Sequence, residues 1–196
     1  MQNKPVKFRI TGVEGSPLLL KKMNNEDLQS NENAVTKKKI NPAEEAEKAA
    51  HRLATTNGHN KGQLGITSEG FRLGLLLAAS GFKFGKVTAG SVIRSSVMTT
   101  SNLVGLIDPE TKEPIYDYVI DERPIVNKTT KGRSLSYRPK IEKWECILEL
   151  IIDHDFLPEP ERLLPLFNRA GLISGAGSFR PQCKGTFGKY QVSMDI

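Results

Sequence analysis

Four segments of the chain carry the hydrophobic pattern of strands, and the alternation of apolar and polar residues is clearest in two of them. Residues 6–14 carry apolar side chains at Val6, Phe8 and Ile10 with polar ones between, and residues 144–152 alternate over a longer run. Successive side chains of a strand point to opposite faces, so each segment is expected to bury one face. The pattern predicts strands over residues 6–14, 91–99, 144–152 and 187–194.

Two further segments carry the signals of helices. Residues 68–80 are apolar on almost every side, which predicts a buried helix. Thr67 or Ser68 is expected to cap its start, because a side-chain oxygen there can accept from the first free N–H groups. A shorter helix is predicted over residues 160–170, with Gly171 ending it.

The order of these elements is strand, helix, strand, strand, helix, strand. It predicts an α+β protein with a ferredoxin-like (RRM-like) βαββαβ core, whose antiparallel sheet has helices on one face. The length fits a single domain over residues 1–196. Two long insertions interrupt the core. Residues 16–62 are expected to be mobile apart from a short helix capped by Asn41, and residues 100–142 to form a basic, thumb-like hairpin excursion.

Composition narrows the class of protein. Charged residues make up 26% of the chain, and no apolar run approaches the roughly 20 residues that span a bilayer. The first residues lack the apolar stretch of a secretory signal. The two cysteines, Cys146 and Cys183, stand in unlike contexts and give no disulfide framework. A cytoplasmic protein without a membrane partner is therefore expected.

Positive charge is concentrated in two regions. The net charge is +6, and residues 53–140 hold twelve basic and seven acidic side chains. This distribution favours a polyanionic partner on one face. The strongest cluster follows Asn127 and is rich in hydroxyls, and it contains Lys128, Lys131, Arg133, Arg138 and Lys140. Arg123 and Arg138 could instead pair with nearby carboxylates, among them Asp121.

The last 26 residues are rich in glycine, basic residues and phenylalanine. Their five glycines are Gly171, Gly175, Gly177, Gly185 and Gly188. Glycine lets backbone N–H groups approach an anion, and basic and aromatic side chains suit phosphates and bases. We interpret the segment as a flexible cationic loop for nucleic acid. A surface loop that needs glycine only in order to turn remains the alternative.

Three parts of the sequence, in this order, resemble the RAMP superfamily, the backbone subunits of CRISPR effector complexes. Gly65–Arg72 resembles the family's glycine-serine helix start, and Asp121–Lys128 with Tyr137–Leu150 resembles a basic excursion that returns to a strand. Gly171–Arg180 with Lys184–Tyr190 resembles the C-terminal glycine-rich loop. The departure at Phe179-Arg180-Pro181, where the family has a tight glycine-arginine cluster, favours a stand-alone or phage-type relative.

The resemblance implies sequence-tolerant binding of single-stranded RNA, or of DNA, through its backbone. It also implies copies that stack into a homo-oligomer or filament, and contacts with other CRISPR-type subunits. Phe179 would stack on a base, and phosphates would meet the start of the first helix, the thumb-like hairpin and the glycine-rich loop. The residues carried over are Ser68, Arg72, Lys128, Lys131, Arg133, Arg138, Phe179, Arg180, Lys184 and Lys189.

Two other functions stay open. Some members of the family cleave RNA with an aspartate after the first strand, and Asp27 lies in that part of the chain, so a metal-dependent endoribonuclease is one alternative. A CRISPR inhibitor or docking protein on the same fold is the other. The sequence has no P-loop and no Gly-x-Ser-x-Gly motif, and its histidines share no metal-ligand spacing. Binding without catalysis, cofactor or metal is therefore the prediction.

Overall fold

A four-stranded antiparallel sheet forms the centre of the protein in a computed structural model, which describes residues 3–22, 41–55, 60–126 and 133–194. Its strands, in spatial order, are β12 (Tyr190–Ser193), β1 (Asn3–Gly12), β11 (Glu145–Asp153) and β7 (Val97–Thr99). The register places Phe8 opposite Leu148 and Ile10 opposite Cys146, all fully buried. The alternation in the two clearest segments therefore predicts both the central strands and their inward faces.

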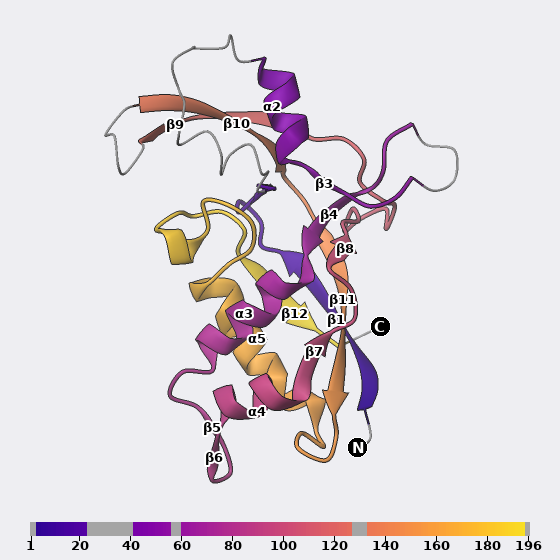
Figure 1. The fold of residues 1–196 in the computed structure, drawn as a ribbon, viewed down its shortest axis with the longest axis vertical. Helices are drawn as coiled ribbons and strands as arrows, with labels where there is room; N and C mark the ends of the chain where they lie inside the picture. Colours follow the sequence, from indigo (N-terminus) through magenta and orange to yellow (C-terminus); the bar gives the residue numbers. More distant parts are fainter. Residues whose placement is uncertain (1–2, 23–40, 56–59, 127–132, 195–196) are drawn as a thin grey trace, which may run out of the picture.

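Two helices cover the buried face of this sheet (Figure 1). They are α3 (Ser68–Ala78) and α5 (Leu164–Ile173), the latter preceded by the 3₁₀ turn η1 (Pro160–Leu163). The ring of Phe8 lies 5.0 Å from that of Phe167 in α5, and Phe71 of α3 contacts Tyr190 of β12 edge to face at 5.4 Å. Sheet and helices thus share one core.

The expected end of the second helix at Gly171 is wrong. Helix α5 continues to Ile173 and is capped by Ser174. A Cβ at Gly171 would lie 1.9 Å from the carbonyl oxygen of Tyr190, so the glycine is needed for close contact between α5 and β12. A glycine that serves packing carries the same signal in the sequence as one that ends a helix.

The strand predicted over residues 91–99 is wrong for most of its length. Helix α4 (Ala89–Ser96) occupies that segment, and only Val97–Thr99 is extended. The β-branched Val92 and Ile93 favoured a strand in the sequence. In the structure they are buried together with Ala89 and Ser96 on one face of the helix, and burial of that face outweighs local propensity.

Shorter strands lie directly before α3 and α4 in the chain. β3 (His51–Arg52), β4 (Leu64–Thr67) and β8 (Leu103–Gly105) form a three-stranded sheet that ends where α3 begins. β5 (Lys83–Phe84) and β6 (Val87–Thr88) form a small hairpin before α4.

A long hairpin of β9 (Val119–Val126) and β10 (Arg133–Ile141) stands at one end of the molecule (Figure 1). β2 (Leu18–Leu19) pairs with its inner strand, and α2 (Pro42–Ala49) packs beside it. The predicted cap of α2 is confirmed, because Oδ1 of Asn41 accepts from the N–H of Ala43 at 3.1 Å. Within the insertion predicted over residues 16–62, residues 23–40 and 56–59 lie outside the described residues.

The α+β class predicted from the sequence is confirmed, with antiparallel sheets throughout. In the described part of the chain, no helix combines the length and the apolar character that crossing a bilayer would require.

Candidate nucleic-acid interface

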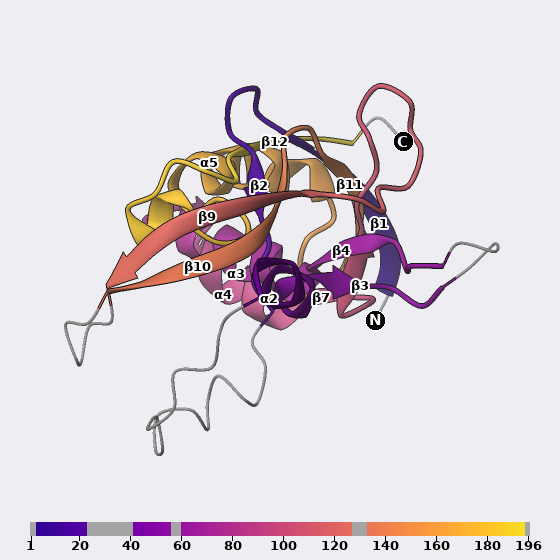
Figure 2. The same ribbon diagram turned by 90° about the horizontal axis from the view of Figure 1, so that it is seen from above.

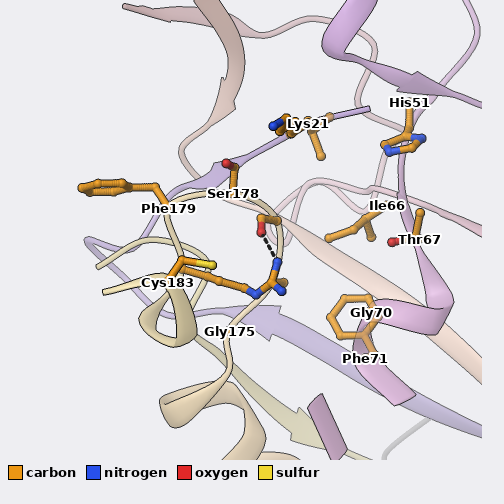
Figure 3. A pocket seen from close by; sticks show the side chains of 14 residues that line it. Lys21, His51, Ile66, Thr67, Gly70, Phe71, Gly175, Ser178, Phe179 and Cys183 are labelled. Carbon is orange, nitrogen blue, oxygen red and sulfur yellow. Dashed lines mark hydrogen bonds between the residues drawn. The ribbon is translucent and has the colours of Figure 1, made fainter. Parts of the chain in front are cut away.

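A cavity of about 350 Å³ lies where three distant parts of the chain meet: residues 20–21, the β3–β4–α3 region and the C-terminal glycine-rich segment (Figure 3). Its apolar wall includes Leu20, Ile66, Phe71 and Ala176. None of the described residues that line it is acidic. Its polar lining is Lys21, His51, Thr67, Ser178, Arg180 and Cys183.

One wall of the cavity belongs to residues 174–189, which we call the glycine loop. The loop is closely packed rather than flexible as expected. A Cβ at Gly177 would lie 2.5 Å from the carbonyl oxygen of Leu19, and one at Gly188 would lie 1.9 Å from that of Ala176. The N–H of Ser178 donates to the Leu19 carbonyl at 2.7 Å, and the N–H of Ala176 to the Gly188 carbonyl at 2.7 Å. The Ser178 amide therefore binds the loop to β2 and the Ala176 amide closes the loop on itself, so both are used within the protein and not by an anion.

The β9–β10 hairpin crosses above the glycine loop (Figure 2) and is joined to it by an aromatic contact. The guanidinium carbon of Arg123 lies 4.5 Å from the ring centre of Phe179 and 4.4 Å from that of Phe187. Asp121 holds the same guanidinium through two hydrogen bonds of 2.5 and 3.0 Å. The expected pairing of Arg123 with Asp121 is therefore confirmed. We call these four residues the aromatic clasp.

Phe179 belongs to this clasp. Its ring points away from the cavity in Figure 3, and the residue is 40% exposed. The role predicted for it, stacking on a base, would have to use the part of the ring that Arg123 and Phe187 leave open. Phe179 also has a left-handed backbone with φ of 54°, which is uncommon for a bulky residue.

Two predicted cations meet at the glycine loop. Arg180 lines the cavity, and its Nη1 donates to the Gly177 carbonyl at 2.8 Å while Nε and Nη2 donate to Oε1 of Gln182 at 3.3 and 3.2 Å. Arg138 reaches down from β10 and donates to the hydroxyl of Ser178. Lys184 is exposed and Lys189 half-buried on the same loop.

The predicted contacts at the start of α3 are placed differently. Ser68 is buried, and its hydroxyl donates to the Ser101 carbonyl, so it anchors the helix and cannot meet a phosphate in this structure. Thr67, one residue earlier, is exposed and lines the cavity. Arg72 is held by Glu69 at 2.5 and 2.8 Å, which also lowers the pKa of that carboxyl.

The remaining predicted residues lie elsewhere. Arg133 is exposed at the first position of β10, near the outer end of the hairpin. Lys128 and Lys131 lie outside the described residues, and so does Asp27, the residue on which the nuclease alternative rests. Within the described ranges, no three His, Cys, Asp or Glu side chains gather in a way that could hold a metal ion.

No family model matches this sequence, and no curated protein matches it. The resemblance to the RAMP superfamily therefore rests on the quoted motifs, and a function for the chain rests on the cavity and its surroundings.

Two residues of the cavity had no signal in the sequence. Lys21 is an exposed residue next to the short strand β2, and His51 begins the two-residue strand β3, so neither belongs to a motif. Burial lowers the pKa of His51, as does the charge of Lys22, against a hydrogen bond to the Lys21 backbone that raises it. At neutral pH the imidazole is therefore uncharged, and since its one N–H donates to the Lys21 backbone, its other nitrogen can accept a hydrogen bond.

The arrangement suits an extended anion with flat apolar groups. Lys21 and Arg180 supply positive charge at the cavity, and Lys184 and Lys189 continue it along the loop. Since no acidic side chain lines the cavity in the described residues, no negative charge there would repel an anion.

Proposed function

We propose that this protein binds single-stranded nucleic acid, with RNA favoured, along the cavity and the adjoining glycine loop, and that it catalyses no reaction. The observation that carries the proposal is the cavity itself, where Lys21 and Arg180, from opposite ends of the chain, both line it and no described lining residue is a carboxylate. Contacts of this kind are made to phosphates, so binding would tolerate any sequence.

The topology supports a ferredoxin-like core. The elements β1, α3, β7, β11, α5 and β12 follow one another in the order βαββαβ, and the sheet order is β12-β1-β11-β7. We propose that this core is of the RAMP type, with the β9–β10 hairpin as the thumb-like excursion. In that assignment the protein would act as a repeating subunit along the strand.

Salt dependence tests the function directly. Fluorescence anisotropy of labelled RNA and DNA strands, measured from about 50 to about 300 mM salt, should show affinity falling with a log–log slope near −0.7 for each phosphate neutralised. Absent or salt-insensitive binding would refute the proposal. Sizing the protein with and without the strand tests the repeating subunit, and incubating the RNA with magnesium reports any cleavage.

A double variant tests the site. Arg180→Ala with Lys184→Ala should weaken binding alike for all sequences and reduce the salt slope by up to about 1.4. The matched control is Lys83→Ala with Lys86→Ala, which removes the same charge from the β5–β6 hairpin. Equal losses in both pairs would mean that only the net charge matters.

A further inference from the structure

We propose that the cavity holds one nucleotide unit of the bound strand, with the base against the apolar wall of Ile66, Phe71 and Ala176 and the phosphate at Lys21 and Arg180. This inference rests on the proposed function and specifies which part of the strand, a single nucleotide, occupies the cavity. It assigns the cavity to a base, whereas phosphate binding alone would need only the charged surface.

The size of the cavity agrees with one such unit. Its volume of about 350 Å³ is at the lower end of the roughly 300–1,000 Å³ found for small-molecule sites. A site of this size fits a single nucleotide better than a longer stretch of strand, which would continue along the exposed part of the glycine loop.

The lining is divided as a nucleotide would require. Ile66 and Phe71 lie together on one side of the cavity, opposite Ser178 and Cys183 (Figure 3). Because Ile66 is 5% and Phe71 1% exposed, they form the apolar floor of the cavity, and a base would meet only the small part of each side chain that borders it. His51 and Thr67 lie on the same side as these two residues and bring polar atoms that can bind the edge of a base.

Arg180 is fixed in advance for an anion. Three of its five N–H groups donate within the glycine loop, to Gly177 and Gln182. The other two have no acceptor among the described residues. A guanidinium held in this way loses little freedom when it binds, so its charge acts on the ligand without a rearrangement.

Gly70 makes the inference testable. It lines the cavity from the first turn of α3 and is exposed, and a Cβ there would meet only Oγ1 of Thr67, at 3.4 Å. Leucine at this position would therefore occupy the cavity without displacing the backbone. Since leucine also favours a helix more than glycine does, Gly70→Leu should fold at least as well as the unaltered protein.

The experiment is a calorimetric titration of the full chain with AMP, GMP, CMP and UMP, and with ribose 5-phosphate, which has the phosphate but no base. At least one nucleotide should bind about tenfold or more tightly than ribose 5-phosphate, and Gly70→Leu should weaken that binding by about tenfold or more. The matched control is Gly90→Leu in α4, where a Cβ meets nothing within 4 Å and which does not line the cavity. The Gly90→Leu variant should change the affinity by less than about twofold.

The outcomes separate the inference from the proposed function. If ribose 5-phosphate binds as well as the nucleotides, the cavity is an anion site and the inference is overturned. If RNA strands bind with the expected salt slope while no nucleotide binds, the inference fails and the proposed function stands. If no strand binds, the proposed function fails, and a nucleotide that still binds in a Gly70-dependent way assigns the cavity to free nucleotides. Circular dichroism of both variants confirms that they are folded.

Discussion

The glycine loop and the hairpin face each other across the aromatic clasp, and different kinds of contact hold them. The loop is attached through its backbone, since the N–H groups of Ser178 and Gly188 donate to the carbonyls of Leu19 and Pro17. The hairpin is attached beyond its strand pairing through side chains, chiefly Arg123 and Arg138. It also exposes large apolar residues, with Val119 60% and Val126 59% accessible.

This difference indicates which of the two, the hairpin or the loop, can adjust to a ligand. Backbone hydrogen bonds hold the loop, and its glycines pack against neighbouring carbonyl groups with no room for a side chain. The loop backbone therefore has one well-packed arrangement and acts as a fixed wall. Side-chain contacts to the hairpin can be broken singly, and each contributes no more than about 1–2 kcal/mol. We therefore expect the hairpin, rather than the loop, to move when a strand enters.

The largest expected effect tests the fixed wall. Gly188→Ala should destabilise the protein by about 3 kcal/mol or more, because φ at this position is 67° and the new Cβ would lie 1.9 Å from the Ala176 carbonyl oxygen. Gly85→Ala is the matched control, with φ of 63° and nothing within 4 Å, and should destabilise by about 1 kcal/mol. Urea unfolding measures both. Equal losses would show that conformation alone matters and that the loop is not closely packed.

The sequence predicted those parts of the fold whose signal is local. Residues 6–14 and 144–152 became β1 and β11 because alternation directly reflects burial of one face. Residues 91–96 formed a helix because their apolar side chains meet the core on one helical face, and a short segment with β-branched residues fits both patterns.

The candidate site was predicted less completely than the fold, since its geometry depends on contacts far apart in the sequence. The sequence identified the glycines but not why glycine is needed there. The atoms that exclude a Cβ at Gly177 and Gly188 belong to Leu19 and Ala176, and the sequence does not show these contacts. Ser68 was assigned to a ligand from its place at a helix start, and only the structure shows its bond to Ser101. Lys21 lines the cavity only because the folded chain brings residues 20–21 beside the glycine loop, and no motif in the sequence indicates this.

A smaller effect tests the contact between the two sides. Arg123→Ala should destabilise the protein by about 1–2 kcal/mol, because it removes the cation from both rings and leaves Asp121 without its partner. Arg123→Lys keeps the charge but loses the flat guanidinium, and should recover about half of the loss. Hydrogen exchange should show faster exchange in β9 and β10 and unchanged protection at Ser178. Faster exchange at Ser178 as well would mean that the hairpin holds the loop in place.

Acid should loosen the hairpin before the loop, because a carboxylate holds the root of the hairpin. Arg52 pairs with Glu47 at 2.5 and 3.0 Å, and the Tyr118 hydroxyl, just before β9, donates to the same carboxyl at 2.9 Å. The bond to Arg52 lowers the pKa of Glu47 below its ordinary 4.5.

A lowered pKa in the folded protein means that Glu47 stabilises the fold above about pH 4.5, and that the stabilisation is lost as pH falls through the folded pKa. Thermal unfolding between about pH 3 and about pH 6 should therefore depend less steeply on pH in Glu47→Gln than in the unaltered protein. Glu44→Gln on the same helix is the control. An identical pH dependence in Glu47→Gln and the unaltered protein would exclude this bond as the acid-sensitive contact.

The smallest expected effect separates the charge of the loop from its shape. Lys184 has a left-handed backbone with φ of 62° after the 3₁₀ turn η2 (Pro181–Cys183), so Lys184→Gly should relieve strain and change the stability by no more than about 1 kcal/mol. If Lys184 contacts a phosphate, the same variant should reduce the salt slope of strand binding by about 0.7. Lys86→Gln, which removes an exposed charge from the β5–β6 turn, should leave the slope unchanged. A slope unaltered in Lys184→Gly would place the strand away from Lys184, because the loop would then contribute its shape and Arg180 but not this outer charge.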